Sequence, residues 1–216
     1  MIRTNGRWEQ MKKDRLIKKF DKQAKMYENN QHHHRIAGWR KDLIKNAYGK
    51  VLEVGVGAGA NFPYYNQANV EITGVDFSSE MIKSAKRAAD RFQVKAEFMT
   101  KDLEELSFAD NSFDCIVSTL SLCTYTDPIA VLRKFNRWCR EGGRVLLMEH
   151  GLSSNPLLSL AQKIIDPVYK QISGCHCNRN FPELMKKSHL QVEHMERYWS
   201  DIFVLIQAKP LKEQIN

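Results

Sequence analysis

The chain lacks the features that would place it among membrane-spanning, secreted or zinc-finger proteins. No apolar run reaches the roughly 18–20 residues that a membrane-spanning helix needs. Residues 1–7 lack the apolar core of a signal peptide. The five cysteines are odd in number and scattered, which favours reduced thiols and a cytoplasmic protein. No second cysteine pair accompanies Cys175 and Cys177, so we expect no metal site.

The chain has 216 residues, enough for one α/β domain with a sizeable core. Its net charge of +8 is unevenly distributed. Residues 1–50 hold 14 Lys and Arg against 5 Asp and Glu, whereas the rest of the chain is nearly neutral. We therefore expect a basic, amphipathic helical segment over residues 1–49 and a main domain over residues 50–216. Such a basic segment suits an acidic surface as partner.

Strand-like and helix-like patterns alternate through the main domain. This alternation predicts a parallel sheet with right-handed crossovers and a ligand site beyond the carboxyl ends of the strands. A pair of strands near the carboxyl end closes the pattern. The expected strands are residues 50–54, 70–75, 94–99, 113–118, 144–149, 191–197 and 202–209; the expected helices are 8–28, 35–46, 60–65, 79–90, 128–140, 156–172 and 181–188, with a turn at Gly142-Gly143.

A glycine run directly follows the first expected strand. Gly55, Gly57 and Gly59 let the backbone turn sharply and approach a ligand where a Cβ would collide. Asp76 ends the next apolar run about twenty residues later, where a carboxylate accepts hydrogen bonds from ribose hydroxyls. The pair predicts an adenosine-containing cofactor, and the glycines alone would also fit a nicotinamide dinucleotide.

Four further features separate these cofactors. Glu53 precedes the glycines and suits a cationic group, whereas it would repel a pyrophosphate. Phe77 follows Asp76 and can cover an adenine. Asp102 ends the third strand, where it can accept the adenine amino group, and residues 111–118 end the fourth strand beside the same crevice. Together they make a nicotinamide dehydrogenase the weaker interpretation.

These ordered motifs resemble the class I S-adenosylmethionine-dependent methyltransferases over about residues 50–150. The resemblance implies a Rossmann-like α/β fold: a seven-stranded sheet with helices on both faces, the last strand antiparallel, and N-terminal helices that cap the site. It implies S-adenosyl-L-methionine as cofactor. The cofactor-binding residues it implies are Glu53, Gly55, Gly57, Gly59, Asn61, Asp76, Phe77, Met81, Asp102, Leu103, Ser118 and Thr119.

Three stretches carry a finer resemblance: residues 118–128, 142–150 and 166–175. They are similar to the methyltransferase-like 7 thiol methyltransferases and to bacterial phospholipid N-methyltransferases. Residues 20–27 resemble the start of the quinone C-methyltransferases. The chain departs from the thiol enzymes, because it has no hydrophobic N-terminal anchor and reads Cys-Asn-Arg-Asn at 177–180. The expected function is methyl transfer to a small, lipophilic acceptor: a phospholipid amine, a thiol or a quinone.

The methyl group of the cofactor is already activated, so the protein has mainly to position a nucleophile and exclude water. Tyr27, Tyr125 and His150 are the candidate catalytic residues. Tyr27 resembles an aromatic residue that closes over the cofactor; alternatively it packs on the body of the protein. His150 would be a base or a polar wall, or else cap its strand. Further wall candidates are His32, Leu122, Cys123 and Tyr198.

Residues 8–28 place aromatic and apolar residues among many lysines. Either this helix packs on the domain with a solvated lysine face, or it also touches an anionic membrane. The alternative function is an RNA-directed methyltransferase or a nucleic-acid-binding protein that uses the same basic arm. The arm contains no RNA-binding motif, so a nucleic-acid partner is the weaker hypothesis.

Overall fold

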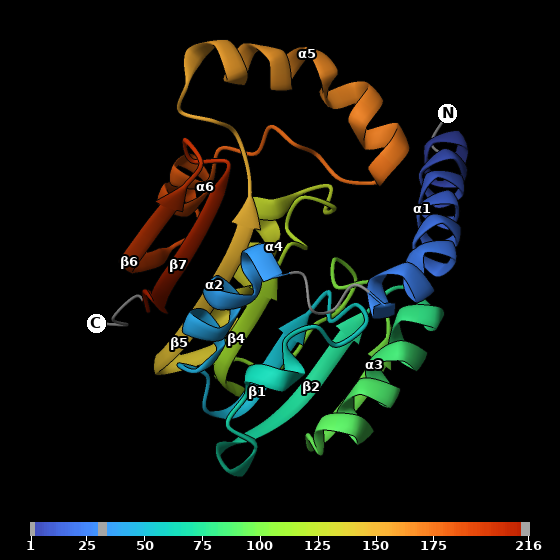
Figure 1. Cartoon of the computed structure of the whole chain (residues 1–216). Coiled ribbons are helices and arrows are strands. Elements are labelled where there is room, and N and C mark those ends of the chain that lie inside the picture. The colour runs from blue at the N-terminus through green and yellow to red at the C-terminus, as the bar shows by residue number, and fades with distance from the viewer. Residues whose placement is uncertain (1–2, 30–33, 213–216) are drawn as a thin grey trace.

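The computed structural model describes residues 3–29 and 34–212. It is built around a seven-stranded sheet with the order β3-β2-β1-β4-β5-β7-β6 (Figure 1). β7 runs antiparallel to both of its neighbours, and the other pairings are parallel. The predicted fold is thus confirmed. The strands are β1 (Gly49–Val54), β2 (Val70–Asp76), β3 (Ala96–Thr100), β4 (Phe113–Thr119), β5 (Cys139–His150), β6 (Leu190–Tyr198) and β7 (Phe203–Pro210).

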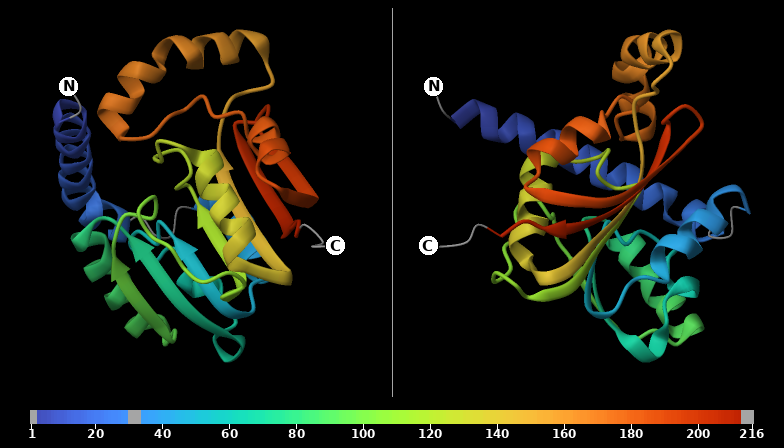
Figure 2. Two further views of the ribbon diagram at one scale, coloured as in Figure 1. Left: turned by 180° about the vertical axis from the view of Figure 1, so that it is seen from behind. Right: turned by 90° about the vertical axis from the view of Figure 1, so that its left-hand side faces the viewer.

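Helices cover both faces of the sheet (Figure 2). α2 (His34–Ile44) and α3 (Ser79–Phe92) bury apolar residues in one core cluster, and α4 (Pro128–Trp138) and α6 (Phe181–Lys187) bury theirs in the other. The central strands β1 and β4 are apolar on both sides because each side faces one of these clusters. Ser78 caps α3, with its hydroxyl accepting a hydrogen bond from the Met81 amide.

Two helices lie beyond the carboxyl ends of the parallel strands (Figures 1 and 2). They are α1 (Arg3–Asn29) and α5 (Pro156–Ser173). α5 leaves the sheet after β5, and its last turn reaches α1, where the Lys19 ammonium donates to the Gln171 carbonyl. A Cβ on Gly174 would lie 2.9 Å from Leu16 and 3.0 Å from Phe20, so α1 and the end of α5 are in close contact.

α1 is also tied to α3, through the ion pair of Glu28 with Arg87 and the hydrogen bond of Ser78 to Asp21. The expected division into residues 1–49 and 50–216 stays a prediction. Within the described residues, no helix has the length and apolar character needed to cross a bilayer.

The structure differs from the predicted elements around Gly142 and Gly143. The helix expected to reach Arg140 ends at Trp138, and β5 begins at Cys139 and runs through both glycines. The pairing of β4 with β5 shifts register between Phe113 and Cys115, which marks a bulge. Gly142 has φ +71°, as bulges often require. The glycines therefore mark an irregular strand start, not a turn. Of the helix expected over residues 60–65, only a 3₁₀ turn at Phe62–Tyr64 forms.

Candidate active site

A cavity of about 420 Å³ lies at the carboxyl ends of β1, β2, β4 and β5. One end is formed by the loop after β1, the end of β2 and the start of α3. The other end is formed by the loop after β4, the end of β5 and the last turn of α5, and α1 runs along the side. The residues that line it are Phe20, Gln23, Met26, Tyr27, Arg40, Glu53, Gly55, Val56, Gly57, Ala58, Ala60, Asn61, Asp76, Phe77, Met81, Thr119, Leu120, Ser121, Cys123, Thr124, Tyr125, His150, Tyr169, Ser173 and Cys175.

The glycine loop shapes the first end of the cavity. Gly57 has φ +53°, a backbone conformation that side chains rarely adopt, and a Cβ there would meet only the Gly55 carbonyl oxygen at 3.8 Å. The space beside Gly57 is therefore open to a ligand. Gly59 has a different role, because a Cβ on it would lie 2.9 Å from that of Ala88 and 2.8 Å from the Phe62 ring. Gly59 thus permits close packing of the loop on α3.

Asp76 connects this loop to α3. Its Oδ2 accepts a hydrogen bond from the Gly57 amide at 3.0 Å, and its Oδ1 accepts one from the Ser78 amide at 2.9 Å. The carboxyl group is buried, and this burial raises its pKa to about 6. A carboxylate that faces a cavity in this way gains from hydroxyl donors on a ligand.

Glu53 is the second buried carboxyl group at this end. It accepts hydrogen bonds of 2.8 Å from the Asn61 amide and from the Tyr65 hydroxyl. Burial raises its pKa to about 7, although both hydrogen bonds oppose this. A ligand with a positive charge would stabilise the ionised form.

Arg40 of α2 also lines the cavity, and sequence reasoning missed it. It donates to the Asn61 side-chain oxygen at 2.5 Å and to the Thr119 hydroxyl at 3.0 Å. Its charge favours the ionised form of Glu53, which lies nearby. No motif near residue 40 ties it to the glycine loop in the sequence, so only the fold reveals its position.

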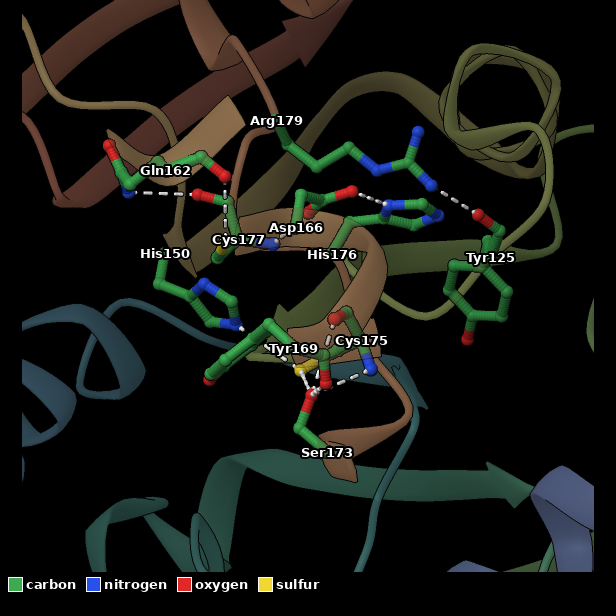
Figure 3. A network of polar contacts seen from close by, with 10 residues as sticks. All are labelled: Tyr125, His150, Gln162, Asp166, Tyr169, Ser173, Cys175, His176, Cys177 and Arg179. Carbon is green, nitrogen blue, oxygen red and sulfur yellow. Dashed lines mark hydrogen bonds and ion pairs between the residues drawn. The ribbon is translucent and has the colours of Figure 1, made fainter. Parts of the chain in front are cut away.

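The three predicted catalytic residues, Tyr27, Tyr125 and His150, all line the cavity. Tyr27 is 44% exposed and comes from α1. Tyr125 is buried, which raises the pKa of its hydroxyl. His150 ends β5 and points toward the last turn of α5 (Figure 3).

The position of Cys175 beside the cavity was also not predicted from the sequence. Its Sγ lies 3.8 Å from His150 Nε2 and 3.3 Å from the Ser173 hydroxyl (Figure 3). Contacts with Cys123 and His150 hold the pKa of the Cys175 thiol below its usual value, against the effect of burial. Burial lowers the pKa of His150, but the contact with Cys175 outweighs this and leaves it above its usual value.

Eight of the twelve predicted cofactor-binding residues line the cavity: Glu53, Gly55, Gly57, Asn61, Asp76, Phe77, Met81 and Thr119. The other four are not among the residues that line it. Asp102 forms an ion pair of 2.6 Å with Lys13, and Leu103 is buried in the core. Ser118 donates to Glu149, and Gly59 packs on α3 as described. The binding roles assigned to all twelve stay predictions.

The remaining wall candidates are placed as follows. Cys123 lines the cavity, whereas Leu122 lies in the core. Tyr198 stacks on Trp39 with ring centroids 4.1 Å apart and does not line the cavity. His32 lies outside the described residues.

Comparison with known proteins identifies this arrangement. Residues 52–147 match the family described as a methyltransferase domain. This region of the chain, from β1 to β5, is a class I S-adenosylmethionine-dependent methyltransferase domain. The fold agrees: the YcgJ protein of Bacillus subtilis superimposes with a TM-score of 0.65 at 20% identity, over 84% of this chain and all of that one.

The relatives of this methyltransferase differ in the acceptor that their names state. It is 34% identical to a phosphatidylethanolamine N-methyltransferase of Cereibacter sphaeroides, over 54% of this chain and 58% of the relative. It is 32% identical to the thiol S-methyltransferase TMT1B of Rattus norvegicus, over 68% and 62%. It is 27% identical to a ubiquinone/menaquinone biosynthesis C-methyltransferase of Bdellovibrio bacteriovorus, over 69% and 74%. The chain thus spans less than two thirds of the phospholipid and thiol relatives.

S-adenosyl-L-methionine is the cofactor of this methyltransferase, and the residues of the cavity fit it. The molecule carries an ammonium group, two ribose hydroxyls and an adenine. The buried carboxyl group of Glu53 suits the ammonium, and that of Asp76 suits the hydroxyls. Phe77 lines the cavity next to Asp76, and its ring meets Phe20 edge-on at 5.2 Å.

Proposed function

We propose that the chain transfers the methyl group of S-adenosyl-L-methionine to a small, lipophilic acceptor. The acceptor belongs to the chemistry of its relatives: a phospholipid amine, a thiol or a quinone. The observation that carries this proposal is the shared cavity, which is lined both by the glycine loop with Asp76 and by Tyr27, Tyr125 and His150.

The protein's contribution is positioning. Glu53, Asp76 and the loop around Gly57 would bind and orient the cofactor, which would supply an activated methyl group for transfer. α1 and the last turn of α5 cover the second end of the cavity and limit the access of water. Such an arrangement accelerates transfer because the acceptor atom is held in line with the carbon–sulfur bond.

The exposed residues of α5 support the proposal that a lipophilic acceptor is taken from a membrane surface. It exposes large apolar side chains along most of its length, including Leu157 at 79%, Ile164 at 70% and Ile172 at 71%. Its neighbour α1 exposes Lys18, Lys22 and Lys25. An apolar helix face beside lysines suits the headgroup boundary of an anionic bilayer. We propose that α5 provides the apolar part of the contact and that residues 8–28 provide charge.

Cofactor binding is tested by calorimetry with S-adenosyl-L-methionine. Gly57→Ala should weaken binding by more than about tenfold, because the added methyl group occupies the open space beside the loop. Gly142→Ala is the matched control: Gly142 also has a positive φ and open space around it, but it lies in β5 away from the cavity. Absence of binding by the unchanged protein would refute the proposal.

The acceptor is identified by release of S-adenosylhomocysteine with a panel of alkyl thiols, phospholipid amines and quinols. Turnover with at least one class is expected, and a protein that binds the cofactor but turns over none of them would refute the acceptor assignment.

The membrane contact is tested by flotation with anionic liposomes. Ile164→Glu with Ile172→Glu should abolish co-flotation, whereas Leu211→Glu, also at an exposed apolar residue but outside α5, should not. Failure of the unchanged protein to float would refute the contact.

A further inference from the structure

Three soft ligand side chains meet at the second end of the cavity. Cys123 comes from the loop after β4, His150 from the end of β5 and Cys175 from the loop after α5. The sulfur atoms of the two cysteines and a ring nitrogen of His150 all lie within 4.8 Å of one another. His150 and Cys175 face each other at 3.8 Å (Figure 3). All three residues line the cavity.

Contacts outside the three side chains fix this arrangement. The His176 amide donates to the Cys123 carbonyl at 3.0 Å, which ties the two cysteine-bearing loops together. The Cys175 amide donates to the Ser173 hydroxyl at 3.2 Å, at the point where Gly174 ends α5 in a left-handed conformation. The cysteines are therefore brought together by the backbone of the fold.

The rest of the Cys175-His176-Cys177 run points elsewhere (Figure 3). The His176 ring is paired with Asp166 at 2.7 Å, and the Cys177 thiol donates to the Gln162 carbonyl at 3.6 Å. The run itself does not form a site, whereas its first residue joins two ligands from distant parts of the chain.

We propose that Cys123, His150 and Cys175 bind a zinc ion and leave its fourth coordination position open to the cavity. Zinc takes sulfur at about 2.3 Å and imidazole nitrogen at about 2.0–2.1 Å, so tetrahedral ligand atoms lie roughly 3.3–3.8 Å apart. The contact of His150 with Cys175 already has this spacing, and Cys123 needs to move by about 1 Å or less. Three protein ligands with one open position are typical of catalytic zinc sites.

The open position determines the acceptor class, and this step rests on the proposed function. A thiol that binds there loses its proton to solvent and is held as a thiolate. Its lone pair then forms the new sulfur–methyl bond, while the electrons of the broken bond return to the cofactor sulfur. The products are a thioether, S-adenosylhomocysteine and the released proton. The site thus favours a thiol over a phospholipid amine or a quinone.

Metal binding is measured first, on the metal-free full chain kept reduced with a phosphine. Titration should show one equivalent of Zn²⁺, and Co²⁺ should produce the thiolate charge-transfer band and the strong visible bands of tetrahedral cobalt. Cys123→Ser, Cys175→Ser and His150→Ala should each weaken binding by more than about 100-fold, the upper end of what outer-shell changes cost. Cys177→Ser, two residues from Cys175 but bonded to Gln162, should bind as the unchanged protein does.

Three outcomes would overturn the zinc site, the thiol assignment or the proposed function. No metal binding, or binding that Cys175→Ser leaves unchanged, would overturn the zinc site. An alkyl thiol such as 2-mercaptoethanol should change the visible bands of the Co²⁺ protein, and no change would overturn the thiol assignment. Calorimetry with S-adenosyl-L-methionine on the same samples separates the proposals: lost cofactor binding refutes the proposed function, whereas lost metal binding alone refutes this inference.

Discussion

Glu53 is a buried acid whose ionised form we expect to weaken the free protein and to strengthen cofactor binding. It is 2% exposed, and its burial raises its pKa from the ordinary 4.5 to about 7. The folded protein therefore holds a proton between about pH 4.5 and 7 that the unfolded chain has released. The resulting stabilisation is present below pH 4.5 and is lost as the pH rises through 7. A pKa difference of one unit corresponds to about 1.4 kcal/mol. Ionisation of Glu53 therefore lowers the free energy of unfolding by roughly 3 kcal/mol at pH 8.

Glu53→Gln removes this charge but impairs one of the two hydrogen bonds from Asn61 and Tyr65, at a cost of about 1 kcal/mol. We expect the variant to be more stable than the unchanged protein by about 2 kcal/mol at pH 8, an advantage that disappears at pH 5. Urea unfolding of the free protein at the two pH values measures this difference.

Cofactor affinity should change in the opposite direction. The ammonium group of S-adenosyl-L-methionine favours the ionised carboxylate, so affinity should fall by up to about tenfold for each pH unit below 7. Glu53→Gln should bind the cofactor about 10- to 100-fold more weakly at pH 8, the equivalent of one lost charged hydrogen bond. Calorimetry measures both effects, and Glu71→Gln, an exposed carboxylate paired with Lys95, is the control. A variant that is less stable at pH 8 and binds the cofactor normally would refute the reasoning.

Three further substitutions test the fold around the site. Asp127→Ala removes the acceptor for the Ile129 and Ala130 amides at the start of α4, so urea unfolding should show a loss of about 1 kcal/mol with unchanged cofactor affinity. Gly59→Ala forces a methyl group against Ala88 and Phe62 and should lower the free energy of unfolding by about 1–3 kcal/mol; an unchanged thermal midpoint would contradict this packing. Leu132→Ala in the core should cost about 2–5 kcal/mol, whereas Leu157→Ala on exposed α5 should stay within about 0.5 kcal/mol, and equal losses would contradict the observed burial.

The sheet and the cofactor end of the cavity were predictable from the sequence because their determinants are local. Each parallel strand is a short apolar run, and Glu53, Gly57 and Asp76 lie at or directly after the strand ends. The bulge at Gly142 and Gly143 was mistaken for a turn, because a glycine pair fits both and only the pairing with β4 distinguishes them. Asp102 follows β3 as expected, yet it faces Lys13 of α1, a contact between distant segments.

The acceptor end was less predictable because its residues come from distant segments. Tyr27 and His150 were predicted one at a time, whereas the closeness of His150 to Cys175 depends on the path of α5. Arg40 was missed for the same reason. In the Cys175-His176-Cys177 run, successive side chains contact different partners: His150, Asp166 and Gln162.

Residues 151–180 leave the sheet after β5 and return to it at α6, so α5 and Cys175 belong to one continuous excursion of the chain. The glycine loop, Glu53 and Asp76 lie outside that stretch. An excursion with a single exit and a single return can be exchanged or lengthened in evolution, or in the laboratory, without altering the pairing of β1, β2 and β4. The proposed acceptor end thus draws Tyr169, Ser173 and Cys175 from a segment that can vary without changing the strands that carry Glu53 and Asp76.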